Sequence, residues 1–385
     1  MKKLIALLLA LVMALSLAAC AAPAADPAAP AADDGAAAAP EADVPADLPA
    51  YKVGVILYDL SNLWAQNIMQ GIESLGKELN VTFEYAIGGT DPEAPVTAVQ
   101  NFGAAGCDGI LTLHPGAVMS TLVEICEENE MFIVSSNDPA NASEDYASFS
   151  ASPWFAGEVW EDDYEVAYEI ATDMIANGAQ TFALTGFPEG LSAQMDKRLQ
   201  GARAAVADGG AEIVTEGLSF NKAEAAENIL SQYPDIDVLF SSVETLSTAY
   251  QPIVNAGLAD SIMMNCYDPA EGLLEAMQDG VIDYAVDGTM ADSMIAFVLL
   301  YNAMSGHKMT QDDGSAASIQ MQYVIAKSAE EYETILAYVS GENPPYTLAE
   351  LAPYITVLNA DASFSALRDY AGAFSLEDVI ARRGA

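Results

Sequence analysis

The chain has 385 residues, and 13 Lys and Arg against 56 Asp and Glu give it a formal net charge of −43. This charge excludes nucleic acid as an expected partner, because binding there needs clustered basic side chains. It also argues against electrostatic attraction to anionic lipid. The length is too great for one typical hydrophobic core and suits two domains.

The N-terminal residues predict export and lipid attachment. Two lysines precede an apolar stretch over residues 4–17, and small residues then lead to Cys20. A charged start, an apolar core and a small-residue cleavage point make a secretory signal. A cysteine directly after the small residues resembles the bacterial lipoprotein signal, which implies that residues 1–19 are removed and that Cys20 carries lipid. An ordinary signal with a chance cysteine is the alternative.

Residues 20–50 consist almost wholly of Ala, Pro, Asp, Glu and Gly. This composition cannot bury a core and predicts a disordered, solvated tether. No later apolar run reaches the roughly 18 residues that span a bilayer. We therefore expect an extracytoplasmic protein whose folded part is anchored to the cell membrane by lipid.

Short apolar runs alternate with helical patterns after the tether. The first series predicts strands at 52–58, 81–86, 109–113 and 131–135, separated by helices at 64–79, 91–105 and 118–129. The second predicts helices at 160–176, 192–208, 222–232, 245–256, 269–278 and 292–304, with strands at 181–185, 213–218, 238–241, 261–267 and 284–286. This alternation indicates an α/β fold with parallel sheets in two similar lobes.

Seven motifs follow one another in the chain: Val53-Gly54-Val55, Leu60-Ser61-Asn62-Leu63-Trp64, Gly71, Ala105-Gly106-Cys107-Asp108-Gly109-Ile110-Leu111, Tyr233-Pro234-Asp235-Ile236-Asp237-Val238-Leu239-Phe240, Tyr267-Asp268 and Gln278-Asp279-Gly280-Val281-Ile282-Asp283-Tyr284. In this order they resemble the ribose/galactose-type family of periplasmic solute-binding proteins, the type I receptors of sugar ABC importers. The resemblance covers roughly residues 51–327.

The resemblance implies two doubly wound parallel-sheet lobes, joined by three crossover strands, with ligand bound between them. We expect the N-terminal lobe at 51–150, with 290–325 returning to it, and the C-terminal lobe at 151–289. The crossovers are expected near 149–152, 287–290 and 324–327. Residues 326–385 exceed the usual family length, and we expect them to pack on the C-terminal lobe.

The resemblance also implies ligand-binding residues. Asn62 and Trp64 match the polar residue and the aromatic ring that follow the first strand, although Trp64 could instead belong to the core. Asp268 matches an acceptor carboxylate for hydroxyl groups, although it could instead cap a helix opening at Pro269. Trp154 and Phe155 are expected to open the second lobe as a wall of the cleft, and packing between the lobes is the alternative.

Other expected positions depart from the family. Asn137-Asp138 stands where Asp-Arg is common, Val243-Glu244 where Asn-Asp is usual, and Asp287 where Gln is common. No basic residue stands at Met195-Asp196. We include Asn137, Asp138, Glu244 and Asp287 in the ligand site and infer that the cleft lacks buried cations. An anionic solute would then be rejected, whereas a neutral sugar or polyol, or a cationic solute, would be accepted.

The remaining chemistry-bearing residues form no catalytic or metal-binding pattern. The cysteines after Cys20 have no regular spacing, so we interpret them as buried, with a Cys107–Cys126 disulfide as the alternative. The two histidines, His114 and His307, lie far apart in the chain. No metal motif, phosphate loop or nucleophile–base pair is present. We therefore expect no enzyme, no metal and no cofactor.

These observations lead to two hypotheses. The first is a monomeric, lipid-anchored receptor that captures a small polar solute, most simply a sugar or related polyol, and delivers it to an ABC permease. The second is a sensory protein that presents a signal molecule, for example an autoinducer, to a membrane kinase or chemoreceptor. Both use the same fold.

Overall fold

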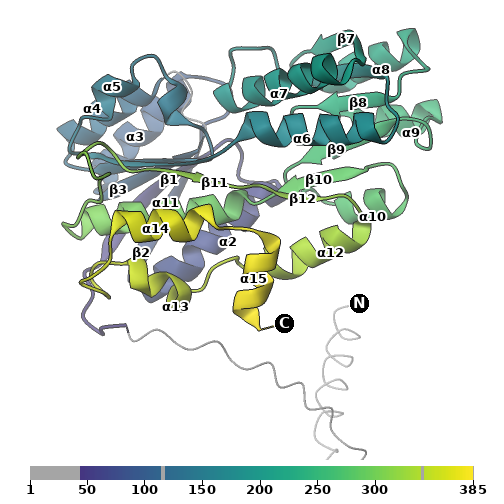
Figure 1. Ribbon diagram of the computed structural model, residues 1–385. Coiled ribbons are helices and arrows are strands. Elements are labelled where there is room, and N and C mark those ends of the chain that lie inside the picture. The colour runs from purple at the N-terminus through teal and green to yellow at the C-terminus, as the bar shows by residue number, and fades with distance from the viewer. Residues whose placement is uncertain (1–43, 114–117, 340–341, 385) are drawn as a thin grey trace, which may run out of the picture. The chain divides into compact units, whose positions relative to one another are not determined.

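The computed structural model describes residues 44–384 apart from 114–117 and 340–341 (Figure 1). The predicted signal peptide, Cys20 and the tether up to residue 43 lie outside the described residues, as does His114. The last part of the expected tether contacts the folded body. Val44 and Leu48 pack against the core, and the side chain of Asn80 donates a hydrogen bond to the carbonyl of Leu48 at 2.9 Å.

The first sheet has the strand order β11-β5-β4-β3-β1-β2, and every strand pair in it is parallel. Its strands are β1 (Tyr51–Leu57), β2 (Val81–Ile87), β3 (Gly109–Leu113), β4 (Phe132–Ser136), β5 (Phe155–Glu161) and β11 (Ser318–Met321). Helices cover both faces, as a parallel sheet requires (Figure 1). They are α2 (Leu63–Glu78), α3 (Glu93–Ala105), α4 (Met119–Glu128), α5 (Tyr146–Phe149) and α11 (Thr289–Met304), with a short turn η2 (Ala140–Ala142).

The second sheet has the order β12-β10-β9-β8-β6-β7, with only β12 antiparallel to its neighbour among the described pairs. Its strands are β6 (Thr181–Gly186), β7 (Glu212–Leu218), β8 (Val238–Ser241), β9 (Met263–Tyr267), β10 (Tyr284–Asp287) and β12 (Val324–Ala326). The helices of this lobe are α6 (Asp163–Ala176), α7 (Ala193–Gly209), α8 (Lys222–Gln232), η3 (Leu246–Tyr250), α9 (Gln251–Ala256) and α10 (Leu273–Gln278).

The two sheets repeat one topology. In each, the first strand lies second from one edge, the next strand forms that edge, and the following strands are added on the other side. Ligands of such doubly wound sheets bind at the carboxyl ends of the strands, where the strand order reverses. The predicted fold of two doubly wound lobes joined by crossovers is thus confirmed, and the repeat makes positions in one lobe comparable with positions in the other.

The first crossover lies later in the chain than predicted. We expected it near 149–152, but β5 pairs with β4 and with β11 in the first sheet, so the chain enters the second lobe only after Glu161. The strand is hard to recognise because Gly157, Glu158 and Glu161 interrupt its apolar pattern, and both glutamates are buried. The second crossover lies at Gly288, within the expected range 287–290. The third lies at residues 322–323, directly before the expected range 324–327.

The C-terminal extension contacts both lobes, so packing on the C-terminal lobe alone is not what the structure shows (Figure 1). Its helices are α12 (Ala329–Tyr338), α13 (Leu348–Leu351), η4 (Ala352–Tyr354), α14 (Phe364–Gly372) and α15 (Leu376–Arg383). In the second lobe, α12 packs on α10 and β12, whereas α14 packs on β11 of the first sheet. The side chain of Asn302 on α11 binds Tyr354 and Thr356 of the extension, with each distance at 2.9 Å.

The structure shows the state of the cysteines and the surroundings of the long helix α11. Cys107, Cys126 and Cys266 are buried and free, so the alternative of a Cys107–Cys126 disulfide is wrong. Helix α11 is buried on all sides because the first sheet, α2 and the extension surround it. In the described part of the chain, no helix combines the length and the hydropathy that crossing a bilayer would need.

Candidate ligand-binding site

A cavity of about 980 Å³ lies between the two lobes, at the carboxyl ends of several strands. The first lobe contributes the segment after β1, namely Tyr58, Ser61, Asn62, Leu63, Trp64 and Gln66. The second lobe contributes Phe187 after β6, three residues of α7, Lys222 on α8, and the loops after β8 and β9. Volumes of this size are typical of small-molecule sites.

The first-lobe wall combines an amide with an aromatic ring. Asn62 is the N-cap of α2, and its side-chain oxygen accepts a hydrogen bond from the backbone N–H of Ala65 at 2.8 Å. Since the oxygen is used in this way, the amide NH₂ group is the part of Asn62 that can donate to a ligand. Trp64 is 6% exposed and belongs to the core, yet it also lines the cavity. Trp64 is therefore a core residue that also reaches the cavity, and its role in ligand binding stays a prediction.

Asp268 presents a carboxylate to the cavity. It follows β9 with φ +66°, a left-handed conformation that is unfavourable for a residue other than glycine. Its backbone N–H donates to the carbonyl of Val286 at 3.0 Å. The helix after it starts at Leu273 with Gly272 as N-cap, so the alternative of a capping role for Asp268 is wrong. Burial raises the pKa of this carboxyl group, while the charge of Arg198 lowers it.

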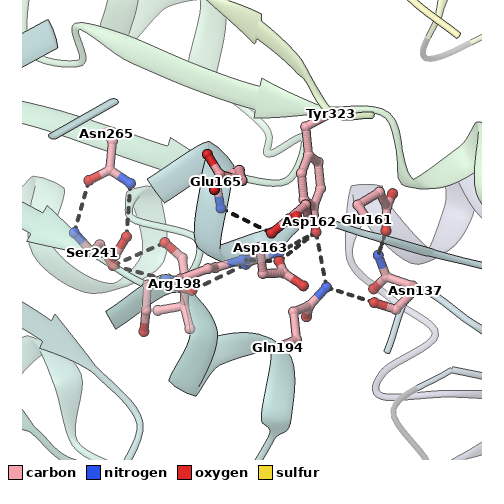
Figure 2. A network of polar contacts seen from close by, with 12 residues as sticks. Asn137, Glu161, Asp162, Asp163, Glu165, Gln194, Arg198, Ser241, Asn265 and Tyr323 are labelled. Carbon is pink, nitrogen blue, oxygen red and sulfur yellow. Dashed lines mark hydrogen bonds and ion pairs between the residues drawn. The ribbon is translucent and has the colours of Figure 1, made fainter. Parts of the chain in front are cut away.

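Arg198 overturns the inference that the cleft lacks a buried cation. It lies on α7, is 1% exposed and lines the cavity. Its Nε donates to Asp163 at 2.8 Å and its Nη2 to the hydroxyl of Tyr323 at 2.9 Å (Figure 2). The guanidinium carbon lies 3.9 Å from the ring centroid of Tyr267. A signal for it exists in the sequence, because Arg198 shares the buried face of α7 with Gln194, one turn earlier.

Asn137 and Asp138 do not line the cavity. Both are buried, and they contact α7 of the second lobe. The carbonyl of Asn137 accepts a hydrogen bond from the Gln194 side chain at 3.0 Å, and its own amide donates to Glu161 at 3.2 Å (Figure 2). Burial raises the pKa of Asp138 to about 6, although the backbone N–H of Gln194 and the charge of Arg198 favour its ionised form. These two residues connect the lobes beside the ligand site.

Buried carboxyl groups gather where the lobes join. Glu161 at the end of β5 and Asp292 in α11 are both about fully buried, and each lies close enough to the other to influence its pKa. Two buried carboxyl groups this close are disfavoured as two anions, since like charges in a low dielectric repel each other. Burial raises the pKa of Asp292 to about 8 and also raises that of Glu161, whose pKa the charge of Asp292 raises further. At neutral pH, the pair therefore holds a proton.

The remaining predicted residues divide between the cavity and the protein interior. Glu244 lines the cavity and accepts hydrogen bonds from the backbone N–H of Ser247 at 3.0 and 3.1 Å. Asp287 is buried at the second crossover, where it accepts a hydrogen bond from Gly288 at 2.7 Å. Trp154 packs against Phe132, and Phe155 is fully buried in the first-lobe core. The structure thus brings together Asn62, Trp64, Glu244 and Asp268, but not Asn137, Asp138, Trp154, Phe155 or Asp287.

An aromatic pair connects the two lobes at the cavity. Tyr58 follows β1 and Phe187 follows β6, and their ring centroids lie 6.5 Å apart. The ammonium of Lys222 lies 3.5 Å from the ring centroid of Phe187. Among the described residues, no cluster of His, Cys, Asp and Glu has the arrangement of a metal site. The cavity therefore offers aromatic faces, amides and charged groups, which suit non-covalent recognition of a small polar molecule.

The fold and the interlobe cavity define a type I binding protein. The sequence matches the periplasmic binding protein domain family over residues 53–308, more than half of the chain. The chain therefore belongs to the periplasmic binding protein family. A comparison with curated protein sequences finds no match.

Solved structures with this fold share little sequence with the chain. An ABC transporter solute-binding protein from Bacillus halodurans C-125 with bound myo-inositol is 16% identical, with a TM-score of 0.62 over 76% of this chain and 100% of that one. A periplasmic solute-binding protein from Actinobacillus succinogenes 130z with bound D-allose is 19% identical, with a TM-score of 0.63 over 74% of this chain and 99% of that one. A twin-arginine translocation pathway signal protein from Burkholderia phytofirmans is 13% identical, with a TM-score of 0.67 over 78% of this chain and 97% of that one.

Proposed function

We propose that this protein is a lipid-anchored, extracytoplasmic receptor of an ABC importer. It captures a small hydroxylated solute, a sugar or related polyol, as its lobes close, and it delivers the solute to the permease as a monomer without chemical conversion. The observation that carries the proposal is the cavity between the lobes, which receives Asn62 and Trp64 from one lobe and Arg198 and Asp268 from the other.

The proposed binding mode follows from the chemistry of these walls. The rings of Trp64 and Tyr58 offer flat apolar faces that suit the C–H face of a sugar ring. The amides of Asn62 and Gln194 and the carboxylate of Asp268 offer the donors and acceptors that hydroxyl groups need. The bound sugars and inositol in structures of the same fold support this solute class.

Closure of the lobes is the proposed signal to the permease. A ligand shifts the lobes toward the closed state only if it binds that state more tightly than the open one. A solute that contacts both walls of the cavity fulfils this condition, because opening would remove one wall. The predicted lipid on Cys20 and the tether would keep the receptor close to the membrane.

Isothermal titration calorimetry on the chain from residue 44 onward tests the proposal. The panel contains aldohexoses, pentoses, inositols and amino sugars, and small-angle X-ray scattering then follows the radius of gyration with and without the best binder. We expect at least one member to bind and to reduce the radius of gyration. If no member binds, or if saturation leaves the scattering unchanged, the proposed receptor function is wrong.

A further inference from the structure

The charged side chains of the cavity all come from one lobe. Among the described residues, the first-lobe wall contributes only neutral side chains, including those of Tyr58, Asn62 and Trp64. The second lobe contributes four carboxylates and two cations: Glu244, Asp268, Glu271, Glu275, Arg198 and Lys222. A solute in this cavity therefore meets neutral aromatic and amide groups on one side and an excess of negative charge on the other.

The two cations already have partners within the protein. Arg198 forms an ion pair with Asp163 at 2.8 Å, and both side chains are about fully buried, so Asp163 offsets part of its charge, although the charge of Arg198 still lowers the pKa of Asp268. The ammonium of Lys222 lies over the ring of Phe187, which is a favourable position for a cation. Lys222 also lies close enough to Glu244 for that carboxylate to raise its pKa, although burial lowers the pKa overall.

The carboxylate of Asp268, in contrast, has no hydrogen-bond partner among the described residues. The side chain is half-buried at the cavity wall, and its backbone is held in an unfavourable left-handed conformation. A partly desolvated carboxylate without a donor is costly, so a donor from outside the protein would stabilise it. The charge of Arg198 lowers the pKa of Asp268, whereas the charge of Glu244 raises it. Glu244, Glu271 and Glu275 give this wall of the cavity an excess of carboxylates, which favours a positive group there.

We propose that the solute carries a protonated amine on a hydroxylated ring, as in an amino sugar or an aminocyclitol, and that the ammonium group binds Asp268. The inference rests on the proposed function and narrows its solute class. The ring stacks on the first-lobe aromatic residues, and Asn62 and Gln194 bind its hydroxyl groups. Both an ammonium and a hydroxyl group can donate to the carboxylate, but only the ammonium also carries the opposite charge, which is why the amine is preferred to a hydroxyl group.

Matched sugars separate the effect of charge from that of shape. Calorimetry at about pH 6, where the amines are protonated, compares glucosamine with glucose, galactosamine with galactose, and mannosamine with mannose. Glucuronate, galacturonate and spermidine complete the panel. We expect the amino member of the tightest pair to bind at least tenfold more tightly than its neutral partner, and the uronates and spermidine to bind more weakly than either. Binding of the amino sugar should also weaken as salt is added, whereas binding of the neutral sugar should not.

A variant of Asp268 and a control variant test whether the preference for the amino sugar depends on this carboxylate. Asp268→Asn keeps the size of the side chain and removes its charge, so the preference for the amino sugar should fall about tenfold. Asp279→Asn makes the same change outside the cavity, and it should leave the preference intact. If Asp268→Asn does not fold, the effect of salt on amino-sugar binding by the unmodified protein still tests whether the charge of the amine is recognised.

The outcomes separate this inference from the proposed function. If a neutral sugar binds as tightly as its amino partner, or if a uronate binds best, the amine is not recognised and only the inference is overturned. If spermidine binds more tightly than every ring, charge is recognised without a ring, and both the inference and the sugar-receptor proposal are overturned. If no compound binds, the receptor proposal itself is wrong.

Discussion

Asn137 and Asp268 occupy equivalent positions in the two lobes. Each directly follows the fourth strand of its sheet, β4 or β9, and each has a left-handed backbone, with φ +68° and +66°. Their side chains differ in use, because Asn137 is buried in the contact between the lobes whereas Asp268 lines the cavity. The same turn geometry therefore places one side chain in the contact between the lobes and the other at the wall of the cavity.

The two roles of Asn62 can be separated by substitution. Asn62→Ser retains an oxygen that can cap α2 but removes the amide NH₂ group, so stability should change by less than about 0.5 kcal/mol while sugar affinity falls. Asn62→Ala removes both groups and should also cost about 1 kcal/mol of stability. Urea unfolding and calorimetry measure the two effects. Unchanged affinity in both variants would show that Asn62 does not contact the ligand.

The buried ion pair of Arg198 should be important for stability. Arg198→Met leaves Asp163 buried without its cation, and we expect a loss of about 3–5 kcal/mol in the free energy of unfolding. Arg203 on the same helix forms exposed ion pairs with Glu189 and Glu216, and Arg203→Met should cost less than about 1 kcal/mol. Similar losses in the two variants, measured by urea unfolding, would contradict this assignment.

The carboxyl pair Glu161–Asp292 should make stability depend on pH. Its pKa values are raised in the folded state, to about 8 for Asp292, so the folded protein binds more protons than the unfolded chain above about pH 4. The free energy of unfolding should therefore fall as pH rises from about 4 to about 8. Asp292→Asn supplies a permanent donor and should flatten this fall by at least about 1 kcal/mol. The exposed control Asp312→Asn should retain the full slope, and an equal slope in all three proteins would exclude the pair as its source.

Asn302 should control how firmly the extension is attached. Its amide donates to the carbonyl of Tyr354 and accepts hydrogen bonds from the backbone N–H and the hydroxyl of Thr356. Asn302→Ala leaves these partners unsatisfied and should cost about 1–3 kcal/mol. Hydrogen exchange should accelerate around η4 and α14 and remain slow in β1. Asn302→Asp keeps the acceptor for Thr356, so its effect should be smaller, and uniform exchange across both segments would argue against local attachment.

The predicted lipid anchor can be tested in cells that process lipoproteins. We expect the unmodified protein to be labelled by a fatty-acid precursor and to enter the detergent phase. Cys20→Ser should abolish both properties while leaving the folded part intact, because a single side chain carries the attachment. Cys126→Ser, a substitution at a buried cysteine, should leave the labelling unchanged. Labelling of Cys20→Ser would refute the anchor.

The sequence by itself determined the fold class and part of the site. Short buried strands alternate with amphipathic helices, so the order of elements follows from local pattern alone. Asn62, Trp64, Glu244 and Asp268 were identified because each stands close after a recognisable strand, and the carboxyl ends of parallel strands face the ligand. These residues are tied to the site by short chain segments, which leave little freedom for their position.

Only the tertiary structure decided which further residues line the cavity and which lie in the contact between the lobes. Phe187, Arg198 and Lys222 were not predicted, and Trp154 and Phe155 were assigned to the wrong lobe, because strand pairing determines where β5 and its neighbours lie. Likewise, Asn137 and Asp138 were expected in the cleft but contact α7 instead. Such contacts join residues far apart in the chain, and their energies depend on burial and on neighbouring charges that no local pattern contains.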